Sequence, residues 1–331
     1  MRVAIAGIKH WHAHYYYRTA SNTPGVTVVA VADRDMSLCS RIAADLSALA
    51  FADLREMVAR TKPDLVCLLG QHNEVSSQAL WLIEQGVPFI IDKPGGMNYF
   101  DVARIRDQAA AKNHRIDVSF VYRVSDFWKH LSRLIEDDPV TWMSFRLIGG
   151  GPNRYRESGN AWMLDPAQSG GGSTINLSVH FFDLFRLLTR SAATEVTSLM
   201  GNHTWGLPIE DYSSVIMRSP VSVCTVETGY TYPGPAGAWD LRFSICTKSA
   251  YAVLRGDSVL EIYRKAGEPP AHIQTAAAGL SHWFPVFVRE ALTRFMRGEA
   301  PVADATDLAN AMAVVDAAYS SNRLGGVPVK L

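Results

Sequence analysis

The first segment that could do chemistry is Asp92-Lys93-Pro94, which follows the apolar run VPFII. A lysine ammonium at the end of a buried strand can donate a hydrogen bond to a reacting hydroxyl. It then stabilises the negative charge that develops on that oxygen. A surface lysine before a turn has the same local sequence, so Lys93 alone leaves a catalytic and a structural interpretation open.

The second segment runs from Gly170 to Asp183 and begins with three consecutive glycines. On a helix, Asn176 and His180 share a face because they are four residues apart, and His180 and Asp183 are also neighbours. A histidine titrates near neutrality and can shuttle a hydroxyl proton. The alternative is a core histidine. The glycines indicate that the backbone comes close to another group, either a ligand or the strand that carries Lys93.

The third segment, from Gly7 to Ala13, resembles a degraded dinucleotide fingerprint. Gly7 ends the first apolar run, Lys9 or His10 stands where a second glycine is expected, and Ala13 supplies the third small residue. Asp33 lies 20 residues beyond Ala13, the spacing expected of a carboxylate that binds a ribose hydroxyl. The sequence thus predicts a nucleotide crevice in which Lys9 or His10 contacts phosphate oxygens.

Asp33 favours NAD, because a carboxylate accepts a hydrogen bond from the ribose 2′-hydroxyl and repels a 2′-phosphate. The adjacent Arg34 can stack on adenine or pair with that phosphate, which leaves NADP open.

Three histidines, His10, His12 and His14, raise the question of a metal site. On a helix only His10 and His14 would share a face, and no acidic residue or cysteine nearby in the sequence completes a ligand set. We therefore predict no metal.

These segments are positioned by an alternation of strands and helices in the first part of the chain. Such an alternation predicts a doubly wound parallel sheet, whose ligands bind where the strands end. The expected strands cover 2–7, 27–33, 64–70, 87–94 and 115–123. Their carboxyl ends are Gly7, Asp33, Gly70, Lys93 and Arg123.

The pattern changes near residues 121–125. Seven strand-like segments between 141 and 265 have little helix between them, apart from a helix expected at about 175–189, and a long helix is expected at about 305–324. We predict an α/β dinucleotide-binding domain over 1–122 and an α+β domain with an open, mostly antiparallel sheet over 123–331.

Composition excludes several functional classes. The 331 residues contain 32 basic and 32 acidic residues, so no basic excess indicates a nucleic-acid or anionic membrane partner. The four cysteines form no CxxC pair, which argues against a disulfide framework. No signal peptide or membrane span is apparent, and we expect a cytoplasmic enzyme.

Together the segments resemble the Gfo/Idh/MocA family of glucose–fructose oxidoreductase and inositol dehydrogenase-like proteins. The family signatures E-K-P and G-G-G-x-x-x-D-x-x-x-H-x-x-D correspond to 92–94 and 170–183, and WMLDPAQSGGG (162–172) and the tail 298–331 are also similar. The resemblance implies hydride exchange between nicotinamide and a secondary alcohol of a sugar, cyclitol or related molecule. It also implies a homodimer or homotetramer that pairs through the open sheets.

The resemblance assigns roles to individual residues. Lys93 would polarise the reacting oxygen and His180 would be the acid/base, with Asn176 as the third catalytic residue. Substrate contacts would come from Tyr122, Arg123, Trp162, Asn176 and His180. Cofactor contacts would come from Gly7, Ile8, Lys9, His10, Ala13, Asp33, Arg34, Leu69, Gly70, Gln71, His72, Asp92 and Lys93. Further candidates for the pocket are Arg154, Tyr155, Arg156 and Trp205, whose arginines suit a carboxylate or phosphate on the substrate.

Three departures from the family pattern keep alternatives open. The fingerprint lacks its second glycine, Asn176 replaces the family aspartate, and Gly70-Gln71-His72 replaces a T-P-N motif. A lyase or epimerase that oxidises its substrate transiently, or a non-catalytic ligand sensor, would fit the same scaffold.

Overall fold

The computed structural model describes residues 1–234, 238–256, 258–264, 267–276 and 279–331. Its first sheet has six parallel strands in the order β3-β2-β1-β4-β5-β6. The bounds are β1 (Arg2–Ala6), β2 (Thr27–Ala32), β3 (Leu49–Phe51), β4 (Leu65–Leu68), β5 (Phe89–Ile91) and β6 (Ile116–Val118). The predicted doubly wound sheet is confirmed, and the order reverses beside β1, which creates a ligand crevice between β1 and β4.

Five helices connect these strands. They are α1 (Ala13–Ser21), α2 (Met36–Leu46), α3 (Leu54–Thr61), α4 (His72–Gln85) and α5 (Tyr99–Ala111). Several begin at a side-chain cap: the Asp35 carboxylate accepts from the Leu38 amide, and Asn98 accepts from the Asp101 amide. Two predictions were wrong in detail. The short edge strand β3 was not predicted, and the expected strand 115–123 ends at Val118, where the chain turns into a 3₁₀ helix, η1 (Val121–Val124).

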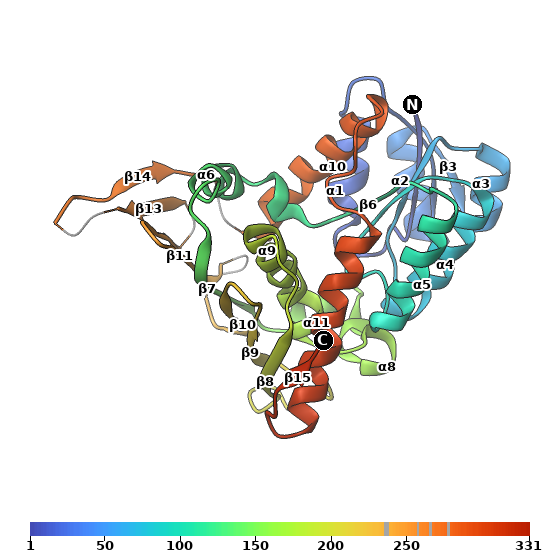
Figure 1. The fold of residues 1–331 in the computed structure, drawn as a ribbon. Helices are drawn as coiled ribbons and strands as arrows, with labels where there is room; N and C mark the ends of the chain where they lie inside the picture. Colours follow the sequence, from blue (N-terminus) through green and yellow to red (C-terminus); the bar gives the residue numbers. More distant parts are fainter. Residues whose placement is uncertain (235–237, 257, 265–266, 277–278) are drawn as a thin grey trace.

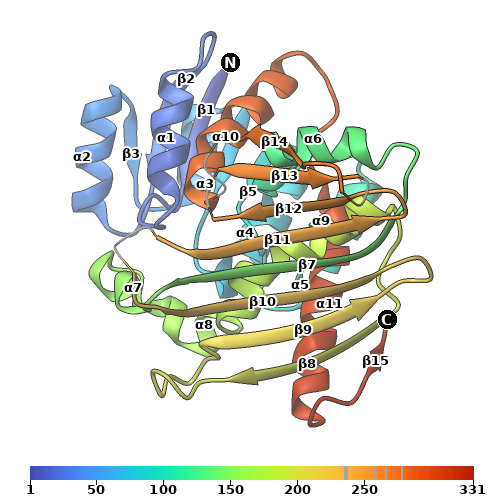
Figure 2. The same cartoon turned by 90° about the vertical axis from the view of Figure 1, so that its left-hand side faces the viewer.

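The second sheet has nine strands in the order β14-β13-β12-β11-β7-β10-β9-β8-β15 (Figure 2). All of its pairs are antiparallel except that between β10 and β7. The bounds are β7 (Val140–Gly150), β8 (Glu195–Gly201), β9 (Tyr212–Arg218), β10 (Val223–Tyr232), β11 (Asp240–Thr247), β12 (Tyr251–Arg255), β13 (Val259–Tyr263), β14 (Ala271–Gln274) and β15 (Val329–Lys330). The mostly antiparallel sheet is confirmed. Strands β14 and β15 were not predicted, and residue 265 of the last expected strand lies outside the described residues.

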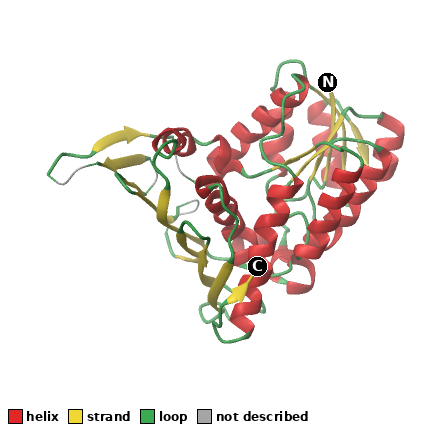
Figure 3. Ribbon diagram, in the orientation of Figure 1, coloured by secondary structure: helices red, strands yellow, loops and turns green. Residues whose placement is uncertain are grey.

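Helices fill the space between the two sheets and leave the far face of the larger sheet uncovered by helix in the drawn part of the chain (Figures 1 and 3). The larger ones are α6 (Asp126–Leu134), α9 (Val179–Thr189), α10 (Leu280–Met296) and α11 (Ala305–Arg323). Helix α10, which was not predicted, packs against α1, and α11 packs against α5. The C-terminal segment therefore returns to the first domain, and the domain boundary at 122/123 stays a prediction.

An aromatic cluster fixes α9 on the large sheet. The Phe181 ring stacks on Phe145 of β7 at 5.0 Å and meets Phe243 of β11 edge-on at 5.2 Å. All three rings are buried. This contact determines which way the neighbouring His180 points. In the described part of the chain, no helix has the length and apolarity that crossing a bilayer requires.

Candidate active site

Lys93 lies two residues beyond the end of β5 and is buried, with 3% of its surface exposed. Its backbone amide donates to Ser119 Oγ at 3.0 Å, and its Nζ donates to both the backbone oxygen and Oδ1 of Asn176, each at 2.7 Å. Burial lowers the pKa of Lys93 to about 8, although the charge of Asp92 acts in the opposite direction. The ammonium is therefore poised close to neutral pH.

Asn176 bridges this lysine to the second domain. It lies on a π-helical segment, Thr174–Ser178, which precedes α9. Its Nδ2 donates to the hydroxyl oxygens of Tyr155 and Tyr230, each at 2.8 Å. Both N–H bonds of the Asn176 side chain, its Oδ1 and its backbone oxygen are thus engaged in hydrogen bonds. These contacts fix the position of the Lys93 ammonium.

The glycines before Asn176 allow close approach to the loop that follows Lys93. A Cβ on Gly170, whose φ is +78°, would lie 2.7 Å from the backbone oxygen of Met97. The Glu210 carboxylate accepts from the amides of Gly172 and Thr174 at 2.9 and 2.8 Å. Gly170 thus approaches the loop that follows the Lys93 strand, whereas a Cβ on Gly171 or Gly172 would meet Tyr319 or Glu210.

Lys93 and Asn176 form part of the wall of a cavity of about 610 Å³ between the domains. Other side chains of the wall include Trp11, His12, Tyr15, Arg154, Tyr155, Trp205, Trp239 and Phe284. Of the further pocket candidates, Arg154, Tyr155 and Trp205 line this cavity, whereas Arg156 is exposed and donates to Asn153 Oδ1 at 2.9 Å. The cavity has the size and the mixture of aromatic and polar groups of a small-molecule site.

One wall of the cavity carries an aspartate–histidine pair that we did not predict. His12 Nδ1 lies 2.7 Å from Asp92 Oδ2, and the other oxygen of Asp92 accepts from Ser119 Oγ. Burial would raise the pKa of Asp92, but the adjacent His12, His10 and Lys93 hold it below its usual value. Asp92 is therefore a carboxylate that orients the His12 ring.

His180 lies deeper in the protein than the cavity wall. Its ring contacts Phe120 and Tyr122 edge-on, and neither ring nitrogen has a hydrogen-bond partner among the described residues. Burial lowers the pKa of His180 well below its usual value, and the Lys93 charge lowers it further. The structure thus brings His180 near Lys93 but places it outside the residues that line the cavity.

Tyr122 and Arg123 also lie away from this cavity. The Tyr122 ring stacks on Phe181 at 5.7 Å. Arg123 donates to Asp183 at 2.8 Å and to Asp307 at 2.9 Å, so it joins η1 to α9 and α11. Their positions indicate a structural role in place of the substrate contacts that we expected.

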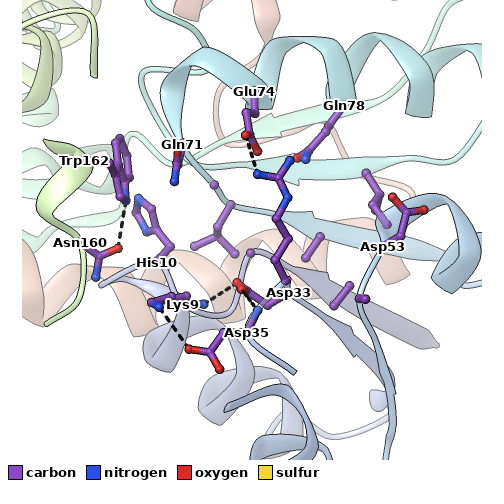
Figure 4. A pocket seen from close by; sticks show the side chains of 18 of the residues that line it. Lys9, His10, Asp33, Asp35, Asp53, Gln71, Glu74, Gln78, Asn160 and Trp162 are labelled. Carbon is purple, nitrogen blue, oxygen red and sulfur yellow. Dashed lines mark hydrogen bonds and ion pairs between the residues drawn. The ribbon is translucent and has the colours of Figure 1, made fainter. Parts of the chain in front are cut away.

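The nucleotide crevice is a second cavity of about 320 Å³ at the ends of β1, β2 and β4 (Figure 4). The predicted cofactor residues that line it are Gly7, Lys9, His10, Asp33, Arg34, Leu69, Gly70 and Gln71. Sequence reasoning missed Asp35, Asp53, Glu74, Gln78 and Asn160, and the predicted substrate residue Trp162 lies here as well. The predicted residues that do not line it are Ile8, Ala13, His72, Asp92 and Lys93. Of the acidic residues that were missed, Asp35 and Asp53 are the N-caps of α2 and α3, and Glu74 lies in the first turn of α4, so helix-start signals in the sequence could have indicated them.

The crevice retains the features that a dinucleotide needs at the first turn. Gly7 has φ +78°, and a Cβ there would lie 2.2 Å from the Leu69 backbone oxygen, so only glycine fits between β1 and β4. Asp33 Oδ2 accepts from the Lys9 amide at 2.9 Å, and Lys9 Nζ pairs with Asp35 at 3.1 Å. Arg34 pairs with Glu74 at 2.9 Å. Carboxylates thus gather where a ribose hydroxyl would bind, which fits NAD.

Aromatic rings separate the two cavities. His10 and Trp162 line the nucleotide crevice and Trp11 lines the larger cavity. Trp11 stacks on His10 at 3.8 Å and lies 5.5 Å from Trp162. The buried His72 ring meets Trp162 at 5.0 Å, while its Nδ1 contacts the Ser169 backbone oxygen at 2.7 Å. A dinucleotide that spans both cavities must pass this partition.

We expected no acidic group to complete a site with the three histidines, because none lies nearby in the sequence. This expectation was wrong, since the fold brings Asp92 next to two of them. Donor atoms of His10, His12 and Asp92 lie within 4.8 Å of one another, while His14 points elsewhere on α1. His10 Nδ1 accepts from the His12 backbone amide at 3.2 Å, and Asp92 contacts His12, whereas His10 Nε2 has no hydrogen-bond partner among the described residues. The absence of a metal stays a prediction.

These features define an NAD-binding oxidoreductase, and comparison with known proteins identifies its family. Residues 1–120 match the family of oxidoreductases with an NAD-binding Rossmann fold, and residues 140–252 match the GFO/IDH/MocA C-terminal domain. The chain belongs to the GFO/IDH/MocA family, which confirms the resemblance. A comparison with curated proteins found no match.

Solved structures share this fold over the whole chain. An oxidoreductase from Agrobacterium radiobacter in complex with NAD⁺, L-tartaric acid and magnesium has a TM-score of 0.88 at 14% identity, covering 100% of this chain and 98% of that one. Levoglucosan dehydrogenase with NADH and levoglucosan has a TM-score of 0.86 at 14% identity, covering 100% and 99%. The myo-inositol 2-dehydrogenase from Lactobacillus plantarum has a TM-score of 0.82 at 14% identity, covering 100% and 99%.

Proposed function

We propose that this protein is an NAD-dependent dehydrogenase or reductase that interconverts a secondary alcohol and a ketone on a small carbohydrate-like molecule. The observation that carries the proposal is the buried Lys93 ammonium in the wall of the cavity next to the nucleotide crevice. An ammonium has three N–H bonds, and two of those of Lys93 go to Asn176. The third is available for the oxygen of a substrate.

Residues of the crevice would hold the cofactor. Asp33 would accept from the adenosine ribose, while Lys9 and His10 lie at the turn where the pyrophosphate binds in this fold. Bound NAD supplies a hydride acceptor or donor. The protein contributes orientation of the substrate and stabilisation of charge on its oxygen, and the buried Lys93 ammonium would provide that stabilisation.

The cavity wall supports a substrate that carries hydroxyls and an anionic group. The Arg154 guanidinium lies over Tyr155, Tyr230 and Trp239 at 4.9, 5.2 and 5.6 Å. It donates to the Gly150 backbone oxygen and the Tyr155 hydroxyl, and no carboxylate among the described residues forms an ion pair with it. A substrate carboxylate would satisfy this cation, so sugar acids and related hydroxy acids are preferred candidates.

Turnover assays test the proposal. Purified protein with NAD⁺ and a panel of sugars, cyclitols and sugar acids should produce NADH absorbance with at least one compound, and Lys93→Met should abolish it. Lack of absorbance change across the panel, together with no NAD binding by calorimetry, would contradict the proposal. A changed substrate without net NADH, detected by NMR, would indicate the lyase or epimerase alternative. Tight binding without turnover would indicate the ligand sensor.

A further inference from the structure

The wall of the larger cavity carries one imidazole among the residues described for it, and that imidazole is His12. The family resemblance assigns proton transfer to His180. This residue is 1% exposed, and its ring packs against aromatic rings and does not line the cavity. A group that exchanges a substrate proton must reach that proton directly or through one water. His12 lines the cavity in which that proton would lie, whereas His180 is not among the residues that line it.

Two contacts fix the orientation of the His12 ring. Its Nδ1 lies 2.7 Å from Asp92 Oδ2, and its face packs on Phe284 of α10, with ring centroids 3.9 Å apart. A carboxylate can only accept, so His12 Nδ1 carries the hydrogen and Nε2 carries the lone pair. The ring therefore presents a hydrogen-bond acceptor on the side away from Asp92.

The same carboxylate connects this imidazole to the lysine. Asp92 and Lys93 are adjacent at the end of β5, and Ser119 binds both, through the Lys93 amide and the second Asp92 oxygen. One short loop thus places an ammonium and an oriented imidazole in the same cavity wall. An oxygen bound by Lys93 would have a proton acceptor nearby.

We propose that His12, oriented by Asp92, is the acid/base group of the reaction in place of His180. This inference rests on the proposed dehydrogenase function. In the oxidation, the substrate O–H bond breaks and its proton passes to His12 Nε2. The carbinol C–H bond breaks and its electron pair and hydrogen leave together to NAD⁺, while the electron pair of the former O–H bond forms the C=O bond. In the reduction, His12 returns the proton to the oxygen.

The charges around His12 suit a base. Burial lowers its pKa, the Asp92 charge and hydrogen bond raise it, and Lys93 and His14 lower it. The titratable groups that face it are Asp92 and Lys93 from the β5 loop and His10, His14 and Tyr15 from its own segment. Arg154 and Glu157 lie elsewhere on the cavity wall, and α10 contributes the uncharged Phe284 ring. The ring is therefore neutral at neutral pH.

Substitutions at three histidines test the assignment. His12→Gln should lower kcat by about 10²–10⁴-fold, the range for loss of a general acid/base, while the Kd for NAD measured by calorimetry stays within about threefold. His14→Gln, two residues further along the chain and half-buried, is the matched control and should retain kcat, because His14 does not line the cavity. His180→Gln should also retain most of it.

A second measurement guards against misfolding. His12→Ala should be inactive but partly restored by added imidazole, whereas a purely structural defect would not respond. Asp92→Asn should shift the acidic limb of the plot of kcat against pH. Asp92→Glu, which keeps the carboxylate, should partly restore the position of that limb. EDTA would remove a metal held by His10, His12 and Asp92. Because the proposed role of His12 needs no metal, turnover should survive EDTA.

The outcomes separate the two proposals. Wild-type protein without turnover or NAD binding would overturn the dehydrogenase function and this inference with it. An active wild type whose His12→Gln variant keeps its kcat, while His180→Gln loses it, would overturn the His12 assignment alone. Loss of activity with EDTA together with bound zinc would also overturn it, since His12 Nδ1 would then be a metal ligand.

Discussion

The Lys93 ammonium donates to two oxygens of one residue, the backbone oxygen and Oδ1 of Asn176, each at 2.7 Å. The Asn176 amide group then donates to Tyr155 and Tyr230, so the side chain can hold only one orientation. A neutral amide at this position holds the lysine without adding a negative charge. This arrangement explains how a chain that lacks the family aspartate still positions Lys93.

We expect Asn176→Asp to raise the pKa of Lys93 above about 8. A carboxylate within hydrogen-bond distance stabilises the charged ammonium, and the two tyrosines can donate to it instead of accepting. The alkaline limb of kcat/KM against pH should therefore move to higher pH. Asn176→Ala, which adds no charge, is the control, and an unmoved limb in the aspartate variant would contradict the argument.

Lys93 should also make stability depend on pH. Its pKa is lowered from 10.5 to about 8 in the folded state, so between these values the unfolded chain binds more protons than the folded one. The free energy of unfolding should therefore rise with pH across this window by roughly 3 kcal/mol, an order-of-magnitude figure from the 1.36 kcal/mol that each pKa unit represents. Below pH 8 the cost of burying the ammonium is fully present.

Chemical denaturation of wild type and Lys93→Met at several values between pH 7.5 and 10.5 checks this. The difference between the two proteins removes the contribution of other titrating groups. Parallel curves for the two proteins would refute the lowered pKa.

Asp33 should determine the choice between NAD and NADP. Its carboxylate, with Asp35 and Asp53, gives the crevice acidic groups, while Arg34 is held by Glu74. Wild type should use NAD, and Asp33→Ser should lower kcat/KM for NAD by about tenfold, the loss expected of one charged hydrogen bond, and raise it for NADP. Glu74→Gln, which frees Arg34, should help NADP and leave NAD unchanged. A wild type that prefers NADP would refute the argument.

Arg154 should distinguish anionic from neutral substrates. Arg154→Met keeps much of the apolar packing against Tyr155, Tyr230 and Trp239 but removes the cation. The KM for a sugar acid should rise about tenfold or more, with little change for the corresponding neutral sugar. The exposed Arg156→Met is the matched control. Equal effects on both substrates would show that Arg154 acts only through packing.

Much of the fold could be predicted because its signals are local. Buried parallel strands appear as apolar runs, and β1, β2 and β4 end next to residues of the crevice. The strand β3 was missed because it has only three residues, and α10 was missed because Pro285 interrupts its pattern. Lys93 was identified because it follows such an apolar run directly.

The rest of the site depends on contacts that no local pattern contains. His12 and Asp92 are 80 residues apart in the sequence and meet only when β1 and β5 align in the sheet. His180 was assigned from its place in the signature, but Val179 precedes it, Phe181 and Phe182 follow it, and α9 is apolar around most of its surface. Helical spacing cannot tell which side of such a helix faces a cavity.

The uncovered face of the large sheet should be the contact between copies of this chain. Trp142 of β7 pairs directly with Val223 of β10, and Ile216 of β9 pairs with Thr225, so apolar side chains on the outer face adjoin one another. Val223 and Ile216 are 45% and 47% exposed in the single chain, and Figure 2 shows the strands that carry them facing the viewer. An exposed apolar patch of this kind is typical of a contact between protein chains. The double variant Ile216→Lys/Val223→Lys should convert a dimer or tetramer into a smaller species, measured by light scattering after size exclusion. Its melting temperature should fall by no more than a few degrees.

Phe100→Lys, on the exposed side of α5, is the control and should keep the wild-type mass. A wild type that is monomeric at micromolar concentration would exclude this role for the sheet.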